Sequence, residues 1–190
     1  MMKGFQKVLL LVSCLTVLSA PSAWAIGVDL FGAGTYTMGT GSPTPTSALG
    51  FPGGGLGLNF KLGQKVDLNI SGLYLTSKYS VDDGIGGTTD VASTKIQAQL
   101  GFVFNLSRVF ALDFGGHYNN YLKNDTGFSG TNDYGLQAGL NLRIPLGATA
   151  AFFIHPQYHY ALSKFSSDDS SLTPNEFVGT VGFSFGMHSK

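Results

Sequence analysis

Three histidines and five charged residues are the side chains whose types and spacing could support chemistry. His155 and His159 are four residues apart, and His117 lies in an earlier segment. In a β-strand that spacing places both imidazoles on one side, about 13 Å apart, which is too far for both to bind one metal ion. The sequence therefore predicts no metal site and no cofactor. The charged residues in segments of alternating polarity are Asp29, Lys61, Asp67, Asp113 and Arg143.

The composition restricts the classes of protein to which the chain can belong. Charged residues make up only 12% of it, against about 25% in a typical soluble domain. Basic and acidic residues balance at 11 each, so no basic field favours a nucleic-acid partner. The apolar residues, 43% of the chain, are scattered singly, which argues against a bundle of membrane helices and favours a β-rich fold.

Residues 1–25 have the pattern of a secretory signal peptide. Two lysines precede an apolar run, and residues 23–25, Ala-Trp-Ala, match the small-x-small cleavage pattern. We expect cleavage after them, which leaves a single domain of residues 26–190 without cysteine. Cys14 lies in a segment that resembles a lipobox, but the apolar run continues beyond it, which disfavours a lipoprotein signal.

Apolar and polar residues alternate with a period of two in eight segments of the remaining chain. In one of them, Leu136 and Leu140 lie on one face while Gln137 and Asn141 lie on the other. This period is that of a β-strand and not of a helix. The predicted strands are residues 28–38, 55–62, 66–71, 95–104, 110–118, 134–144, 152–162 and 177–187.

The connections between these strands alternate in length. Three are tight turns, whereas the other four are longer and rich in Gly, Ser, Thr, Pro and Asp. Such an alternation predicts an all-β, eight-stranded antiparallel up-and-down barrel, with short turns at one end and long loops at the other. The tight turns are near 63–65, 107–108 and 145–147, and the long loops are near 39–52, 78–93, 123–132 and 163–175.

Alternation alone does not tell whether the apolar face points outward to lipid or inward to a ligand cavity, as in lipocalins. The other face carries Gly, Asn, Gln, Ser, His and charged residues, which suit a narrow hydrated interior. All eight tyrosines lie toward the long loops, and several phenylalanines lie near the short turns, as two interfacial girdles require. The domain also lacks the Gly-x-Trp motif of lipocalins. We therefore predict a transmembrane β-barrel with a polar lumen.

The last predicted strand resembles the assembly signal of outer-membrane barrels, polar-x-Gly-x-x-apolar-x-apolar. Thr180, Gly182, Phe185 and Met187 occupy its defined positions. With the leader and the eight strands, the whole domain resembles small OmpA/OmpX-like outer-membrane barrels. This resemblance implies the outer membrane of a Gram-negative bacterium, contacts with its lipid and lipopolysaccharide, and recognition by the barrel-assembly machinery.

We expect the five charged residues to lie on the lumenal face, near the short turns. Because an isolated charge in so narrow an interior is costly, opposite charges should pair and plug the lumen. The guanidinium of Arg143 is expected to bridge two carboxylates at once, which the ammonium of Lys61 cannot do equally well. The carboxylates available are those of Asp29, Asp67 and Asp113. His117, His155 and His159 share the inward parity and are expected to be hydrogen-bonded lumenal residues.

The predicted function is a structural or cell-surface interaction role for a monomeric barrel, with the long loops as the surface for an extracellular ligand. No enzyme activity is predicted, because the sequence has no His-x-Ser motif. A porin-like open pore is disfavoured because side chains just fill an eight-stranded barrel. Two alternatives stay open. One is an OmpW-like conduit for small apolar solutes, which the inward parity of Leu73, Leu75 and Phe153 permits, and the other is a PagP/PagL-like lipid A-modifying enzyme.

Overall fold

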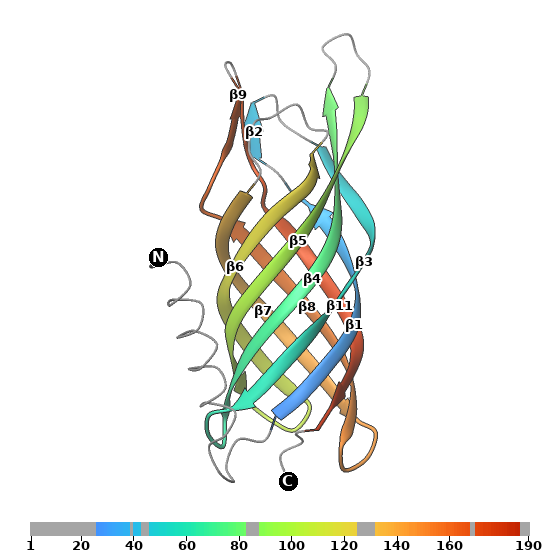
Figure 1. Ribbon diagram of the computed structural model, residues 1–190, viewed down its shortest axis with the longest axis vertical. Coiled ribbons are helices and arrows are strands. Elements are labelled where there is room, and N and C mark those ends of the chain that lie inside the picture. Colours follow the sequence, from blue (N-terminus) through green and yellow to red (C-terminus); the bar gives the residue numbers. More distant parts are fainter. Residues whose placement is uncertain are drawn as a thin grey trace, which may run out of the picture.

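A closed β-barrel forms the body of the protein (Figure 1). The computed structural model describes residues 26–38, 40–42, 46–82, 88–124, 132–167 and 170–186, so the expected signal peptide lies outside the described residues. Eight antiparallel strands follow one another around the wall in up-and-down order, which confirms the predicted fold class. They are β1 (Ile26–Thr37), β3 (Thr46–Lys61), β4 (Val66–Asp82), β5 (Thr88–Asn105), β6 (Phe110–Asn124), β7 (Asn132–Pro145), β8 (Ala150–Ala161) and β11 (Glu176–Phe185).

The two faces of the wall differ as the alternation predicts. In β7, Leu136 is 55% exposed on the exterior whereas Gln137 is 5% exposed in the lumen. Strand β11 alternates strictly between buried and exposed positions over its whole length. The apolar side chains therefore cover the outside of the barrel, and the polar side chains fill the inside. In the described ranges, no helix is long and apolar enough to cross a membrane.

Several strands are longer than their alternating segments. The prediction of a loop at 78–93 is wrong in large part, because the β4–β5 ladder continues to the pair Asp82 and Thr88. This hairpin rises beyond the rest of the wall at the top of Figure 1. This part of the hairpin lies outside the alternating segments 66–71 and 95–104, so a strand forms there without the pattern that predicts it.

A small second sheet lies at the long-loop end of the barrel. Its strands are β2 (Thr40–Ser42), β9 (Phe165–Ser167) and β10 (Ser170–Thr173), in the order β2-β10-β9. These residues were expected in the loops 39–52 and 163–175. Backbone pairing between β2 and β10 instead joins the first long connection to the last one.

Strand β3 bulges outward near its start. Its pairing with β4 shifts register between Ser47 and Gly54, and in this interval Leu49 and Phe51 are 73% and 72% exposed. Behind the bulge, the Thr35 hydroxyl of β1 donates to the Thr76 carbonyl of β4 at 2.8 Å. The next inward residue of β1, Thr37, likewise reaches a β4 carbonyl. Threonine side chains thus connect β1 to β4 where the β3 ladder is interrupted.

Candidate functional site in the barrel lumen

The lumen is filled by polar side chains that reach across it. In β5, Lys95, Gln97 and Gln99 are buried, and Gln99 contacts Ser71 of β4 at 2.9 Å and Gln157 of β8 at 3.3 Å. At mid-height, a cavity lined by Ser71, Gln99 and Gln157 among other residues measures about 20 Å³. One water molecule needs about 10–15 Å³. This cavity therefore has room for little more than one water molecule.

The half of the lumen nearer the long loops holds a buried ion pair between Lys95 of β5 and Glu176 of β11. Their side chains are 0% and 1% exposed. The Ser77 hydroxyl donates to Glu176 Oε2 at 3.0 Å, and Lys95 Nζ lies 5.6 Å from the ring centroid of Tyr121. The two charges compensate each other in an interior where a single charge would be costly. Neither residue is among the charged side chains singled out from the sequence.

Asp133 of β7 is the centre of a neighbouring cluster. Its Oδ2 accepts a hydrogen bond from the Tyr121 hydroxyl at 2.5 Å, and its Oδ1 accepts one from Asn119 Nδ2 at 2.8 Å. His117 Nε2 lies 3.7 Å from Asp133 Oδ1. Because Tyr121 points into the lumen, it does not belong to the exterior girdle expected of all eight tyrosines. Its hydroxyl and ring connect this cluster to the Lys95–Glu176 pair.

The three histidines lie in two separate places. The rings of His117 and His159 stack with their centroids 4.7 Å apart, and His159 Nδ1 lies 3.1 Å from Gln97 Nε2. His155 lies elsewhere, with its Nε2 2.6 Å from Asp113 Oδ1. Throughout the described part of the chain, no three His, Cys, Asp or Glu side chains are grouped to hold a metal ion.

Asp113 of β6 organises the mid-lumen cluster. Besides the contact with His155, it accepts a hydrogen bond from Gln157 Nε2 at 3.0 Å. Gly139 of β7 lies directly against these side chains, and a Cβ there would be 2.2 Å from Asp113 Oδ1 and 2.7 Å from Gln157 Cγ. The glycine therefore leaves the space that the Asp113 cluster occupies.

The five charged residues expected to form one network are divided among separate sites. Asp29 accepts a hydrogen bond from Asn59 at 2.7 Å, and Asp113 belongs to the mid-lumen cluster. Among the described residues, Arg143 approaches one carboxylate, that of Asp67, with 3.9 Å between Nη1 and Oδ2. The expected bridge between two carboxylates is therefore not observed among these residues. Parity places these residues on one face of the wall, but it does not place them at one height or on one side of the lumen.

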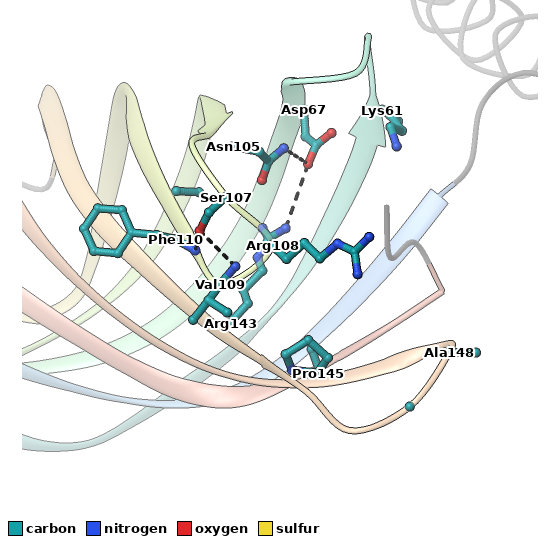
Figure 2. A pocket seen from close by; sticks show the side chains of 13 residues that line it. Lys61, Asp67, Asn105, Ser107, Arg108, Val109, Phe110, Arg143, Pro145 and Ala148 are labelled. Atoms are coloured by element: carbon teal, nitrogen blue, oxygen red, sulfur yellow. Dashed lines mark hydrogen bonds and ion pairs between the residues drawn. The ribbon is translucent and has the colours of Figure 1, made fainter. Parts of the chain in front are cut away.

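A pocket of about 320 Å³ opens at the short-turn end of the lumen (Figure 2). Lys61, Arg108 and Arg143 contribute three positive groups to its lining, and Asp67 contributes a negative group. Asp67 Oδ2 also accepts a hydrogen bond from Asn105 Nδ2 at 2.9 Å. We call this site the basic pocket.

One sector of the long-loop half of the lumen is apolar. A cluster of buried apolar residues from β1, β4 and β11 packs there. It lies next to the bulge in β3, where a Cβ on Gly53 would be 3.2 Å from Leu75 Cδ2. The cluster comprises Ala33, Leu73, Leu75 and Val178, with Phe31 packed against it and Phe153 in edge contact with Phe31 at 6.0 Å between ring centroids.

The residues of the expected assembly signal lie on β11, except Met187, which lies outside the described residues. Thr180 faces the lumen and its hydroxyl donates to the His155 carbonyl at 3.3 Å. Gly182 also faces inward, whereas Phe185 is 48% exposed on the exterior. The last strand of the barrel thus presents a polar inner face and an apolar outer face.

Solved outer-membrane proteins share this fold. OprG from Pseudomonas aeruginosa aligns with a TM-score of 0.62 at 14% identity, over 86% of this chain and 96% of that one. Neisserial surface protein A (NspA) gives 0.56 at 11% identity, over 87% and 100%. A major outer membrane protein from Thermus thermophilus gives 0.52 at 16%, over 86% and 100%. No family model and no curated protein matches the sequence. At these identities the likeness establishes a common fold: the chain folds as small outer-membrane β-barrels do.

Proposed function

We propose that this protein is an outer-membrane barrel of a Gram-negative bacterium with a structural or cell-surface interaction role, and that it does not conduct solutes. The observation that carries this proposal is the filled lumen. The Lys95–Glu176 pair and the clusters around Asp133 and Asp113 occupy it, and the cavity at mid-height measures about 20 Å³. A hydrated solute could pass only by breaking a buried ion pair and several hydrogen bonds.

The exterior supports a location in a membrane. Large apolar side chains on every face of the wall are about half exposed, and Leu30, Leu100 and Leu136 each reach 55%. A continuous apolar surface of this kind is unfavourable in water and favourable against lipid. Exposed tyrosines accompany it, as expected at a membrane interface. They are Tyr36, Tyr74, Tyr118, Tyr134 and Tyr160.

The length of the strands supports a role at the cell surface. Strands β4 and β5 have 17 and 18 residues. At about 3.3 Å per residue and a tilt of about 40°, they rise about 40–45 Å along the barrel axis, whereas an apolar band is only about 25 Å tall. The long-loop end, with the small sheet β2-β10-β9, therefore projects beyond the membrane. It is the surface we assign to an extracellular partner.

Two measurements test this proposal together. The protein should fractionate with the outer membrane and migrate on a gel as a heat-modifiable band, and the purified barrel should show no stable channels in planar bilayers. Recovery as a soluble periplasmic protein would refute the membrane location. Large and long-lived conductance from the wild-type protein would refute the closed lumen.

A conduit for small apolar solutes is the second candidate, because the apolar sector around Leu73 and Leu75 lies beside the bulge in β3. This candidate predicts that a deletion strain takes up an apolar dye more slowly. Expression of the Leu75→Gln variant in that strain should restore a folded barrel in the outer membrane but not the uptake of the dye. Equal uptake in all strains favours the structural role. The same strains should have unchanged lipid A, as we expect of a protein without enzyme activity.

A further inference from the structure

The basic pocket at the short-turn end is a feature that a closed structural barrel does not need. We propose that it binds a phosphate monoester, held as a doubly charged oxyanion by Lys61, Arg108 and Arg143. The pocket chemistry does not depend on the role of the long-loop end. In the membrane orientation proposed above, the pocket faces the periplasm.

The charges of the basic pocket are not balanced within the described part of the chain. Three cationic side chains face one carboxylate, that of Asp67, which already accepts a hydrogen bond from Asn105. Lys61 and Arg108 form no ion pair with a described residue. The only ion pair of Arg143 with a described residue is the one with Asp67, at 3.9 Å. The surplus is two positive charges. A phosphate monoester carries about 1.5 to 2 negative charges at pH 7, so it matches this surplus, whereas one carboxylate neutralises half of it.

Hydrogen-bond donors that the described residues leave available line the same pocket. The Ser107 Oγ accepts the backbone N–H groups of Val109 at 3.2 Å and Phe110 at 3.0 Å, so its own hydrogen is free to donate to a ligand. Arg143 Nε donates a hydrogen bond to Asn141 Oδ1 at 3.3 Å, which leaves terminal N–H groups of the guanidinium available. A guanidinium presents paired donors that fit two phosphate oxygens at once.

The remaining lining indicates an ester and not a free phosphate ion. Val109, Phe110, Pro145 and Ala151 give the pocket an apolar wall beside the charged groups. The volume of about 320 Å³ is in the range of small-ligand sites and exceeds the need of a single phosphate group. An organic substituent can therefore lie against this wall while the phosphate meets the cations.

Two kinds of molecule could supply this phosphate monoester. One is a soluble phosphate monoester of the periplasm, and the other is a lipid with a terminal phosphate in the adjacent leaflet. Phe110 both lines the pocket and is 36% exposed at the end of β6, so the pocket lies near the lipid-facing surface as well as the solvent. The experiment needs one arm for each source.

The test uses the folded protein in phosphatidylcholine nanodiscs. Isothermal titration with phenyl phosphate should show saturable binding, tighter than that of inorganic phosphate and at least tenfold tighter than that of benzoate, which has the ring but a single charge. In the second arm, nanodiscs containing phosphatidic acid are analysed by native mass spectrometry for retained lipid. Binding in one arm only identifies the source and supports the proposal. The absence of binding in both arms, or equal binding of benzoate and phenyl phosphate, overturns it.

Variants locate the binding. Lys61→Gln and Arg108→Gln should each weaken binding about tenfold, the effect of losing one charge-assisted hydrogen bond. Arg108→Lys, which keeps the charge but loses the paired donors, should fall in between. Lys65→Gln is the matched control, because Lys65 is exposed in the neighbouring turn and does not line the pocket. Each variant is first checked for heat-modifiable migration, and an equal loss in Lys65→Gln would overturn the proposal.

Discussion

Replacing Lys95 with methionine should destabilise the barrel strongly. Methionine keeps an unbranched, flexible side chain in the lumen but removes the ammonium group. Glu176, whose side chain is 1% exposed, then retains the Ser77 hydroxyl at 3.0 Å as its donor. Removing one partner of a buried ion pair costs about 3–5 kcal/mol, because it leaves the other charge uncompensated. A solvent-exposed pair is worth only about 0–1 kcal/mol, so the measured value reports on burial.

A double variant separates charge from packing. Lys95→Met combined with Glu176→Gln removes both charges, and replacing a whole buried pair is often neutral in stability. We therefore expect the double variant to regain most of the free energy of unfolding that the single variant loses. Lys78→Met is the control, because Lys78 is exposed on β4 and such surface changes usually stay within about 0.5 kcal/mol.

Urea unfolding in lipid bilayers measures these free energies. The folded fraction is read from heat-modifiable migration on a gel and checked by circular dichroism, since the described barrel contains no tryptophan to report by fluorescence. A loss below about 1 kcal/mol for Lys95→Met would mean that water reaches the pair. A double variant as unstable as the single variant would mean that packing, and not charge, determines the loss. Either result would refute the argument from burial.

Four further substitutions test the facing and packing of the wall by the same unfolding measurement. Leu140→Arg should cost about 2–4 kcal/mol at the lipid face while the lumenal Asn141→Asp costs much less, and the reverse order would mean an inverted barrel. Gly139→Ala should cost about 1–3 kcal/mol because its Cβ would overlap Asp113, and a neutral result would contradict that crowding. Thr35→Val should cost about 1–3 kcal/mol by leaving a β4 carbonyl unpaired, whereas an unchanged stability would argue against the threonine link.

The number of strands and the facing of their residues could be predicted because both depend on local pattern. A residue pointing to lipid must be apolar and its neighbour along the strand must point inward, so a period of two carries the information. This is why the opposite exposures of Leu136 and Gln137 follow from residues 134–144 alone. The same rule fails for the extension of β4 to Asp82, because nothing outside a membrane selects for alternation there.

The pairing of charges across the lumen could not be predicted from the pattern. Lys95 and Glu176 are 81 residues apart and belong to strands that are not neighbours in the sheet. Their contact depends on strand tilt and on the relative heights of opposite walls, which no periodicity reports. A signal was nevertheless present: Lys95 shares the parity of Gln97 and Gln99, and Glu176 shares that of Thr180. Lys95 already lies in the predicted strand 95–104, and extending the last predicted strand by one residue would have directed Glu176 inward as well.

At the bulge in β3, the contact between β1 and β4 depends on particular side chains and not on the backbone alone. Backbone hydrogen bonds of a ladder form whichever side chain a residue carries, so most substitutions in a strand leave them intact. Between β1 and β4 the connecting bonds come from the hydroxyls of Thr35 and Thr37, which are encoded residue by residue. A single substitution of either threonine removes a wall contact there, whereas elsewhere in the ladder most substitutions other than proline leave the backbone hydrogen bonds in place. The bulge is therefore a place where one substitution in β1 can weaken the wall of the barrel.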